Sequence, residues 1–293
     1  MSCTEDSSQE TTTVEENGRN TDSISNDINH TDTLSDDIGV LLGNRDFSDI
    51  ILVVNGEKIP ANKALLAARK VTFRGLLYGG LKESGEGEVV LNQTNVFAFR
   101  ILLRYLYTAK ISLAEYKDDQ LLEILGIAHQ YCVFKLQNAI ADHFKRTLNC
   151  KNVCTVFSTA QSYCLTSLTE SCLCFADQHA SEVLLTQGFL QLSIAEVTQL
   201  VSRDSFVAPE INIFCAIQNW VKAHPKMRPT AVEVLKKHLI LSQISRRDLL
   251  KIVWPSKLLA SDILLDVIDK QDEAELKLLR KLTEEEGKCP TTI

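Results

Sequence analysis

The sequence predicts an α+β unit at residues 33–148, followed by a unit built of helices alone. The segments Ile50–Val54 and Glu88–Leu91 are rich in β-branched residues and stand among segments with helical spacing of apolar residues. From about residue 149 onward we find no convincing strand pattern. Because helices would cluster around a small sheet without alternating with strands, the first unit is expected to be α+β and not α/β.

The first 32 residues differ in composition from the rest of the chain. They contain eight acidic residues and one basic residue, Arg19, so they carry the whole net charge of −7. They are rich in Ser, Thr and Asn, and we expect a disordered acidic tail that is solvated or, alternatively, phosphorylated. The remaining chain has no basic excess, which argues against binding to nucleic acid.

A short amphipathic helix is predicted directly after the tail, beginning near Thr33. Its apolar residues fall at positions i, i+4, i+7 and i+8 of one stripe: Leu34, Ile38, Leu41 and Leu42. Thr33 or Ser35 can cap its start, and Gly43 can end it. A helix of this length cannot bury the stripe by itself, so we expect it to dock on another surface.

The next segment predicts a hairpin that leads into a helix. The run Ile50–Val54 is typical of a strand buried on both faces, and the Asn55–Gly56 pair suits a type I′ turn. The chain returns through Glu57–Ile59, and Pro60 is expected to end this second strand because proline cannot donate to a ladder. The small aliphatic residues Ala61–Ala68 then favour a helix packed closely on the sheet.

The remaining elements follow from helical periodicity and from capping residues. In the first unit we expect helices at Val71–Tyr78, Thr94–Tyr107, Asp119–Tyr131 and Phe134–Leu148. In the second unit, residues 149–270, we expect them near 152–163, 166–178, 193–202, 209–223, 229–240, 245–253 and 261–282. Residues 271–293 are expected to be the end of the last helix and a tail.

The nine cysteines show no disulfide framework, and we expect free and mostly buried thiols. The pairs Cys150/Cys154, with His143 nearby, and Cys172/Cys174 lack the paired spacing of a zinc site. We therefore expect no metal site, although metal binding stays open as the less favoured alternative.

No motif of an enzyme is found in the sequence. There is no Gly-x-Ser-x-Gly elbow, no phosphate-binding glycine loop and no His-Glu-x-x-His sequence, so we expect neither catalysis nor a cofactor. No apolar run is long enough to span a membrane, and the N-terminus has no features of a signal peptide. We expect a cytoplasmic protein and leave presence in the nucleus open.

Three segments of the first unit resemble the BTB/POZ family: Phe47–Ile50, Ile59–Ala67 and Leu103–Thr108. In the second unit, Arg203–Glu210, Phe214 to Trp220 and Val253–Leu259 resemble the BACK domain. The resemblance implies an α+β BTB/POZ domain, a small sheet capped by helices, followed by an all-α BACK domain. Asn62 stands where the family usually has His, and it can still make polar contacts there.

Relatives of this family continue into discoidin-like β-sandwich domains or into a kelch propeller. This sequence stops at Ile293 with neither. We therefore expect a short isoform, an incomplete gene model or a product without a substrate-binding module, and the sequence does not choose among them.

The resemblance also implies a homodimer. In the family the leading helix packs across a two-fold axis, which would place Leu34, Ile38, Leu41 and Leu42 at the dimer interface. Asp49 and Lys63 match the charged residues of the same interface, where burying opposite charges together avoids the cost of burying one alone. The alternative is an intramolecular helix and a local ion pair.

The resemblance further implies binding to cullin-3. Leu81-Lys82-Glu83 matches the hydrophobic-x-acid motif of BTB adaptors, in which Leu81 would fill an apolar groove and Glu83 would fix the orientation. Tyr131 matches an aromatic position of the same surface, although it could also be a packing residue. The helix pair near 152–178 would extend the contact.

Two functions are therefore considered. The first is a non-catalytic dimeric adaptor that links a cullin-3 RING ubiquitin ligase to substrates. The second is a BTB–BACK scaffold or regulator that hetero-dimerises with a full-length paralogue without binding cullin.

Overall fold

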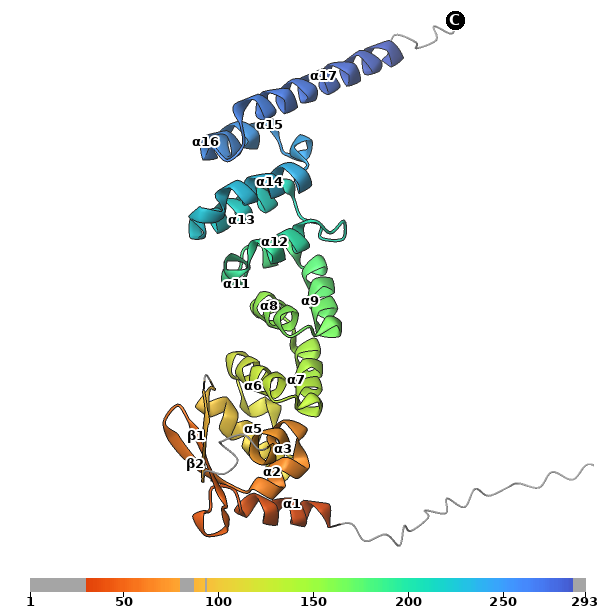
Figure 1. Ribbon diagram of the computed structural model, residues 1–293. Helices are drawn as coiled ribbons and strands as arrows, with labels where there is room; N and C mark the ends of the chain where they lie inside the picture. Colours follow the sequence, from red (N-terminus) through yellow and green to blue (C-terminus); the bar gives the residue numbers. More distant parts are fainter. Residues whose placement is uncertain (1–29, 80–86, 93, 287–293) are drawn as a thin grey trace, which may run out of the picture.

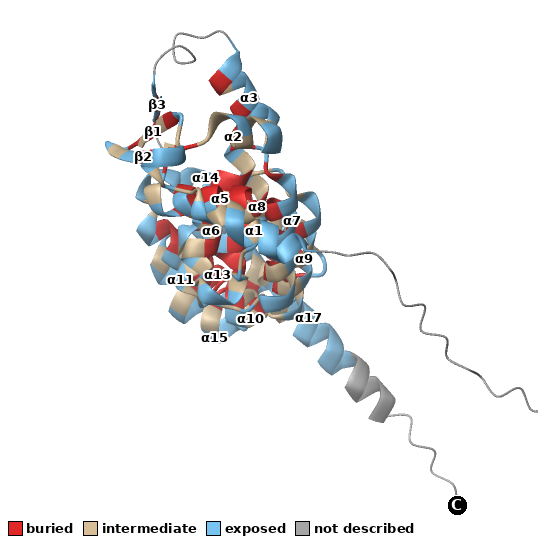
Figure 2. Ribbon diagram, turned by 90° about the horizontal axis from the view of Figure 1, so that it is seen from below, coloured by how far each residue is buried: buried red, intermediate tan, exposed pale blue. Residues whose placement is uncertain are grey.

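The computed structural model describes residues 30–79, 87–92 and 94–286, and the side chains of these residues up to 280. The predicted acidic tail lies outside the described residues except for residues 30–32. The elements are stacked in chain order as a column, with the sheet and its helices at one end and helix α17 at the other (Figure 1). Viewed along the column, buried residues gather near its centre (Figure 2).

The described sheet has three strands in the order β2-β1-β3. The central strand β1 (Ile50–Val54) pairs antiparallel with β2 (Glu57–Ala61) and parallel with β3 (Glu88–Leu91). The predicted turn is confirmed, because Asn55 and Gly56 have φ values of 47° and 85°, both positive as a type I′ turn requires.

Two expectations for this hairpin are wrong. Strand β1 is not buried on both faces: Ile50, Leu52 and Val54 are buried, whereas the alternating residues Ile51 and Val53 are only half-buried. Pro60 does not end strand β2, since it pairs with Ile51 and the strand continues to Ala61. Proline is tolerated here because β2 is an edge strand, where a missing N–H need not interrupt a ladder.

Helix α1 (Thr31–Val40) is the predicted leading helix and begins two residues before Thr33. Neither Thr33 nor Ser35 caps it, because both lie inside the helix. The hydroxyl of Ser35 instead donates to the carbonyl oxygen of Thr108 and fastens α1 to the end of α5. Gly43, with φ of 76°, lies in the turn that follows the helix.

The other predicted helices of the first unit are confirmed, with ends that differ by two residues or fewer. They are α2 (Lys63–Arg69), α3 (Val71–Tyr78), α5 (Val96–Thr108), α6 (Asp118–Gln130) and α7 (Phe134–Thr147). Their buried side chains include Leu66, Phe73, Leu102 and Phe144, which pack in the core with β1. The strand β3 also matches its predicted range.

Within its described residues, the second unit contains helices and connecting loops and no strand. The longer helices match their predicted ranges within two residues at each end, except that α17 ends four residues later than predicted. They are α8 (Val153–Ser162), α9 (Thr166–Gln178), α12 (Ile194–Val201), α13 (Glu210–Ala223), α14 (Arg228–His238) and α17 (Ser261–Glu286). The predicted helix near 245–253 consists of α15 (Arg246–Asp248) and a π-helical segment η5 (Leu249–Val253), followed by α16 (Trp254–Ser256). Buried Trp220 donates from Nε1 to the carbonyl oxygen of Leu192 at 2.8 Å and joins α13 to the segment before α12.

The sequence did not predict the shortest elements, because a few residues show no periodicity. These are α10 (Ala180–Val183), α11 (Gln187–Gln191) and the 3₁₀ turns Arg45–Phe47, Leu113–Glu115, Pro225–Met227 and Leu241–Gln243. For α11 a local signal was present, since Thr186 caps it by accepting the backbone N–H of Phe189 at 3.2 Å.

The expectation of mostly buried thiols is wrong for the described cysteines. All seven of them are free, and only Cys154 and Cys172 are buried. Burial raises the pKa of the Cys154 thiol to about 11 and that of Cys172 to about 12. Cys132, Cys164 and Cys174 are exposed.

Candidate protein-binding surfaces

The predicted dimer helix presents two kinds of residue. Ile38, Leu41 and Leu42 are half-buried and pack against the core of their own chain. Leu34 and Val40 are 57% and 69% exposed. Part of the apolar stripe is therefore used within the chain, and part of it is available to a second protein.

Asp49 and Lys63 are the predicted charged residues of the same interface, and they contact each other through the backbone N–H of Lys63. The carboxylate of Asp49 accepts a hydrogen bond from the N–H of Lys63 at 2.7 Å, at the first residue of α2. Within the described parts of the chain, no ion pair joins the two side chains. Asp49 is exposed and Lys63 half-buried in the single chain.

Asn62, which stands at the position of a family His, makes three polar contacts beside this pair. Its backbone N–H donates to the hydroxyl of Tyr107 at 2.9 Å, and that hydroxyl donates to Oδ1 of Asn62 at 3.0 Å. Its Nδ2 group donates to the carbonyl oxygen of Phe47. Burial raises the pKa of Tyr107, and the negative charge of Asp49 adds to this. The expectation that Asn62 keeps polar contacts is confirmed.

A second surface surrounds helix α3, and we call it the α3 groove. It consists of two adjoining apolar hollows that share Val71 and Gly75. One hollow lies against Ala64, Ala67 and Ala68 of α2, and the other reaches Val90, Tyr131 and Phe134. Val71 is 82% exposed, and Val90 and Phe134 are each 59% exposed. A contiguous exposed apolar surface of this kind is typical of a site for another protein.

Gly75 leaves the centre of the α3 groove open. A Cβ atom at this position would meet no other atom within 4 Å, although Gly75 lies inside a helix. Glycine destabilises a helix interior relative to alanine, so it needs another reason to be there. Gly75 and Val71 were not among the predicted site residues, although a glycine between apolar residues of a predicted helix is a signal in the sequence.

Tyr131 lies at the edge of the α3 groove but is mainly a core residue. It is 6% exposed, and its ring stacks on Phe73 at a centroid distance of 5.2 Å and packs against Phe99 at 5.5 Å. Burial raises its pKa, and a hydrogen bond with Thr94 opposes this in part. Tyr131 therefore supports the groove from below, and only a small part of it can touch a partner.

The other two predicted cullin-binding residues, Leu81 and Glu83, lie outside the described residues. They follow Gly79, which lines the α3 groove, by two and four positions in the sequence. The predicted helix pair of the second unit is α8 and α9, which pack on each other, and α9 also contacts α7.

Family models match both units of the chain. A BTB/POZ domain model matches residues 39–148, and a model described as BTB And C-terminal Kelch, abbreviated BACK, matches residues 153–254. The chain belongs to the BTB–BACK family. This confirms the resemblance noted in the sequence and the fold class, an α+β BTB/POZ domain followed by an all-α BACK domain.

Several BTB–BACK relatives are similar over most of the chain. Human BTB/POZ domain-containing protein 9 is 40% identical over 238 residues, which are 81% of this chain and 38% of that protein. The protein of the same name from Drosophila melanogaster is 35% identical, over 78% of this chain and 31% of that protein. BTB/POZ domain-containing protein 6 from Xenopus laevis is 28% identical, over 70% of this chain and 39% of that protein. The match thus covers less than half the length of each relative.

Among solved structures, the BTB domain of human gigaxonin matches 40% of this chain and 92% of that chain, at 23% identity and a TM-score of 0.35. Across the described ranges, no helix combines the length and the apolar character needed to span a bilayer.

Proposed function

We propose that this chain is a non-catalytic dimeric adaptor that binds cullin-3 through the α3 groove and thereby links a RING ubiquitin ligase to substrates. The observation that carries the proposal is the exposed apolar groove around Val71 and Gly75, next in sequence to Leu81-Lys82-Glu83. An apolar hollow followed by a leucine and an acid can supply an anchor and an orienting charge.

The lining of the α3 groove suits protein contact better than catalysis. Its exposed lining combines apolar side chains such as Val71, Val90 and Phe134 with polar ones that include Arg74 and Asn92. Aromatic residues and arginine are enriched at protein interfaces. General acid–base catalysis would instead need positioned ionisable groups with suitable pKa values. We accordingly propose an adaptor without enzymatic activity that acts in the cytoplasm, with presence in the nucleus left open.

The exposed part of α1 supports the dimeric state. Leu34 and Val40 would be covered by a second chain, and Ile38, Leu41 and Leu42 would complete that surface. Lys63 begins α2 and Asp49, directly before β1, contacts it there, so that a second chain would bury both residues further. A dimer of this kind would present two α3 grooves, and so would recruit two cullins.

The alternative is a BTB–BACK scaffold that hetero-dimerises with a full-length paralogue without binding cullin. The exposed residues of α1 favour this function equally, because a longer member of the family could cover them. In both proposals a second chain covers α1, but only the adaptor binds cullin-3 through the α3 groove.

Binding of the purified chain to the N-terminal region of cullin-3 tests the choice. For Val71→Glu and for the double variant Leu81→Ala/Glu83→Ala, we expect the Kd measured by calorimetry to rise at least about 30-fold, the loss of one interface hot spot. The control is Leu185→Glu, at an equally exposed leucine (85%) in the second unit, which should leave Kd unchanged. Absent binding by the unaltered chain would favour the scaffold. Binding that is unchanged in all variants would show that cullin-3 is bound by a surface other than the α3 groove.

The dimer is measured separately by sedimentation. The unaltered chain is expected at twice its mass of 32.8 kDa, and Leu34→Asp should shift it to the monomer because a charge replaces an exposed leucine. Leu265→Asp, at an exposed leucine of α17 (50%), is the matched control. A monomeric unaltered chain would contradict the dimer without affecting the cullin measurement.

A further inference from the structure

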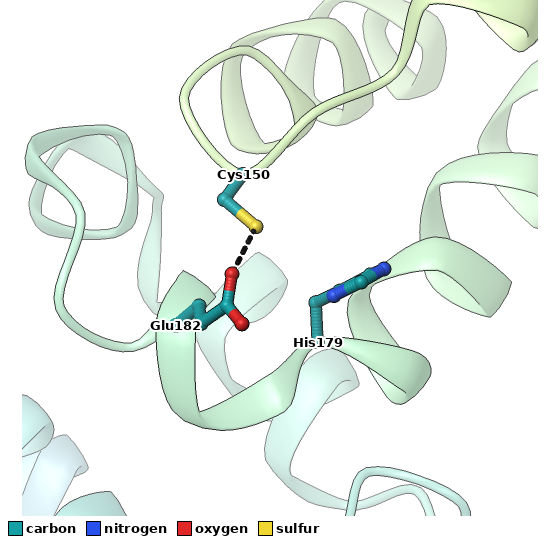
Figure 3. A group of neighbouring side chains, drawn as sticks. All are labelled: Cys150, His179 and Glu182. Atoms are coloured by element: carbon teal, nitrogen blue, oxygen red, sulfur yellow. Dashed lines mark hydrogen bonds between the residues drawn. The ribbon is translucent and has the colours of Figure 1, made fainter.

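Three potential metal ligands from two separate parts of the chain meet in the second unit. Cys150, His179 and Glu182 each offer one ligand atom, and these atoms all lie within 4.8 Å of one another (Figure 3). The thiol of Cys150 donates to Oε2 of Glu182 at 3.1 Å. Cys150 and His179 are half-buried, and Glu182 is exposed. In the sequence, Cys150 was grouped with Cys154 and His143, because His179 and Glu182 lie about 30 residues further along the chain.

Cys150 is held by a turn with a defined hydrogen-bond network. The turn lies between α7 and α8, where the side chain of Asn152 accepts the N–H of Asn149 at 2.8 Å. Asn149 in return accepts the N–H groups of Lys151 at 3.0 Å and of Asn152 at 3.2 Å. Nδ2 of Asn152 also donates to the carboxylate of Asp118 at 2.8 Å, which ties the turn to α6. The backbone at Cys150 is therefore fixed on both sides.

His179 and Glu182 are positioned by the junction of α9 and α10. The N–H of Glu182 donates to the carbonyl oxygen of His179 at 3.0 Å, so the two residues occupy one helical turn. A separation of three residues places two side chains on the same face. The ring of His179 packs against Phe175 at a centroid distance of 4.5 Å, which restricts its orientation. Glu182 has the freest side chain of the three.

The set of donor atoms fits a zinc ion. Thiolate sulfur, imidazole nitrogen and carboxylate oxygen are the three ligand types that Zn²⁺ takes in proteins. A thiolate and a carboxylate would balance the two positive charges of the ion, and the thiol proton would pass to water on binding. Zinc–ligand bonds of about 2.0–2.3 Å place ligand atoms roughly 3.5 Å apart. The Sγ atom of Cys150 and Oε2 of Glu182, at 3.1 Å, already lie within this spacing. The ligand nitrogen of His179 lies within 4.8 Å of both, so the imidazole must approach them by about 1 Å at most.

We propose that Cys150, His179 and Glu182 form a zinc site with water as the fourth ligand. The exposed side of the cluster leaves room for that water. The bound ion would cross-link the turn after α7, where the first unit ends, to the α9–α10 junction of the second unit. It would thus stabilise the arrangement of α8 and α9 relative to the first unit, by an amount that grows with the concentration of free zinc.

Co²⁺ is the probe for this site, titrated into the purified, reduced full-length chain. One equivalent is expected to bind, with a near-ultraviolet charge-transfer band from a cobalt–thiolate bond and intense visible bands of a four-coordinate ion. Zn²⁺ should displace it and abolish both. Cys150→Ser should remove the charge-transfer band, and Glu182→Gln and His179→Asn should each raise the Kd at least about tenfold.

Matched variants identify the responsible thiol. Cys164→Ser removes an exposed thiol at the end of α8 and should leave the spectrum unchanged. Cys3→Ser/Cys289→Ser removes two thiols outside the described residues and should also keep the band. Circular dichroism checks that each variant is folded. Absence of a thiolate band in the unaltered chain, or a band that survives Cys150→Ser, would overturn the proposal.

Discussion

Asp49 caps helix α2, because its carboxylate accepts a hydrogen bond from the backbone N–H of Lys63 at 2.7 Å. Asn62 occupies the N-cap position, but its side chain makes no capping hydrogen bond. Asn62 is instead engaged with Tyr107 and Phe47. A carboxylate at a helix N-terminus satisfies a free donor and interacts favourably with the helix dipole. The sequence resemblance assigns Asp49 to a dimer interface, and the structure adds a role within the single chain.

We predict that Asp49→Ala lowers the free energy of unfolding by about 1 kcal/mol, the usual effect of losing a helix cap. Asp49→Asn keeps an acceptor oxygen, so its free energy of unfolding should fall by less. Lys63→Ala is the control, because the N–H of residue 63 remains. Urea denaturation of the three variants checks this, and equal losses for Lys63→Ala and Asp49→Ala would contradict the capping role.

Replacement of Gly75 should separate stability from binding. Because a Cβ there meets no atom within 4 Å, we expect Gly75→Ala to raise the free energy of unfolding by about 0.5–1 kcal/mol. Gly75→Phe should remain folded and should weaken cullin-3 binding, since its ring would occupy the α3 groove. Thermal unfolding and calorimetry measure the two effects. A Gly75→Phe chain that binds normally would show that the partner does not use the groove.

Tyr131 should act mainly through packing. We predict that Tyr131→Ala destabilises the chain by about 3–5 kcal/mol, because the ring lies between Phe73 and Phe99 in the core. Tyr131→Phe keeps the ring and should lose about 1 kcal/mol or less, since only the hydrogen bond with Thr94 is removed. Chemical denaturation distinguishes the variants. If Tyr131→Phe were folded but failed to bind cullin-3, the hydroxyl group would be a contact.

The buried thiols predict a loss of stability at alkaline pH. Burial raises the pKa of Cys154 to about 11 and that of Cys172 to about 12, whereas a free thiol has about 8.5. At a pH below the pKa of a free thiol, the folded and the unfolded state both keep the thiol protons, so these thiols do not change the free energy of unfolding. As pH rises through and above this pKa, the unfolded state loses its protons first, so the free energy of unfolding falls until the folded thiols ionise. The loss is on the order of 3–5 kcal/mol per thiol, because a pKa difference of one corresponds to about 1.36 kcal/mol.

Denaturation curves between pH 8 and pH 11 measure this effect. Cys154→Ala should reduce the slope of stability against pH, although the replacement also lowers stability at every pH by removing a buried group. Cys164→Ala, at an exposed thiol, should keep the original slope. An identical slope in both variants would mean that Cys154 is not protected from ionisation.

Local signals were sufficient for most elements of this fold. The Asn55–Gly56 turn was predictable because two positive φ values depend on those two residues alone. The long helices were predictable because their apolar periodicity extends over two or more turns, as in α7 and α13. Pro60 was misjudged because its tolerance depends on β2 being an edge strand, which is a property of the sheet.

The candidate sites were less predictable than the helices. The leading helix was expected to dock its apolar stripe on another surface, and the single chain divides that stripe: Ile38 packs on the chain itself, whereas Leu34 is 57% exposed. Tyr131 was assigned to the cullin-binding surface, with a packing role as the alternative. It is 6% exposed, because Phe73 and Phe99, which are distant in sequence, enclose its ring. Spacing along the chain carries no information about such enclosure.

The sequence by itself determined the order of the two units, the hairpin turn, the ranges of the longer helices and the family, because these depend on neighbouring residues or on shared segments. Only the tertiary structure decided which side chains meet. Asp49 reaches α2, Val71 and Phe134 border one groove, and Cys150 approaches His179 and Glu182, each across a separation that local patterning cannot encode. The physical reason is that packing of helices against the sheet and against one another sets these distances, and packing depends on the whole core.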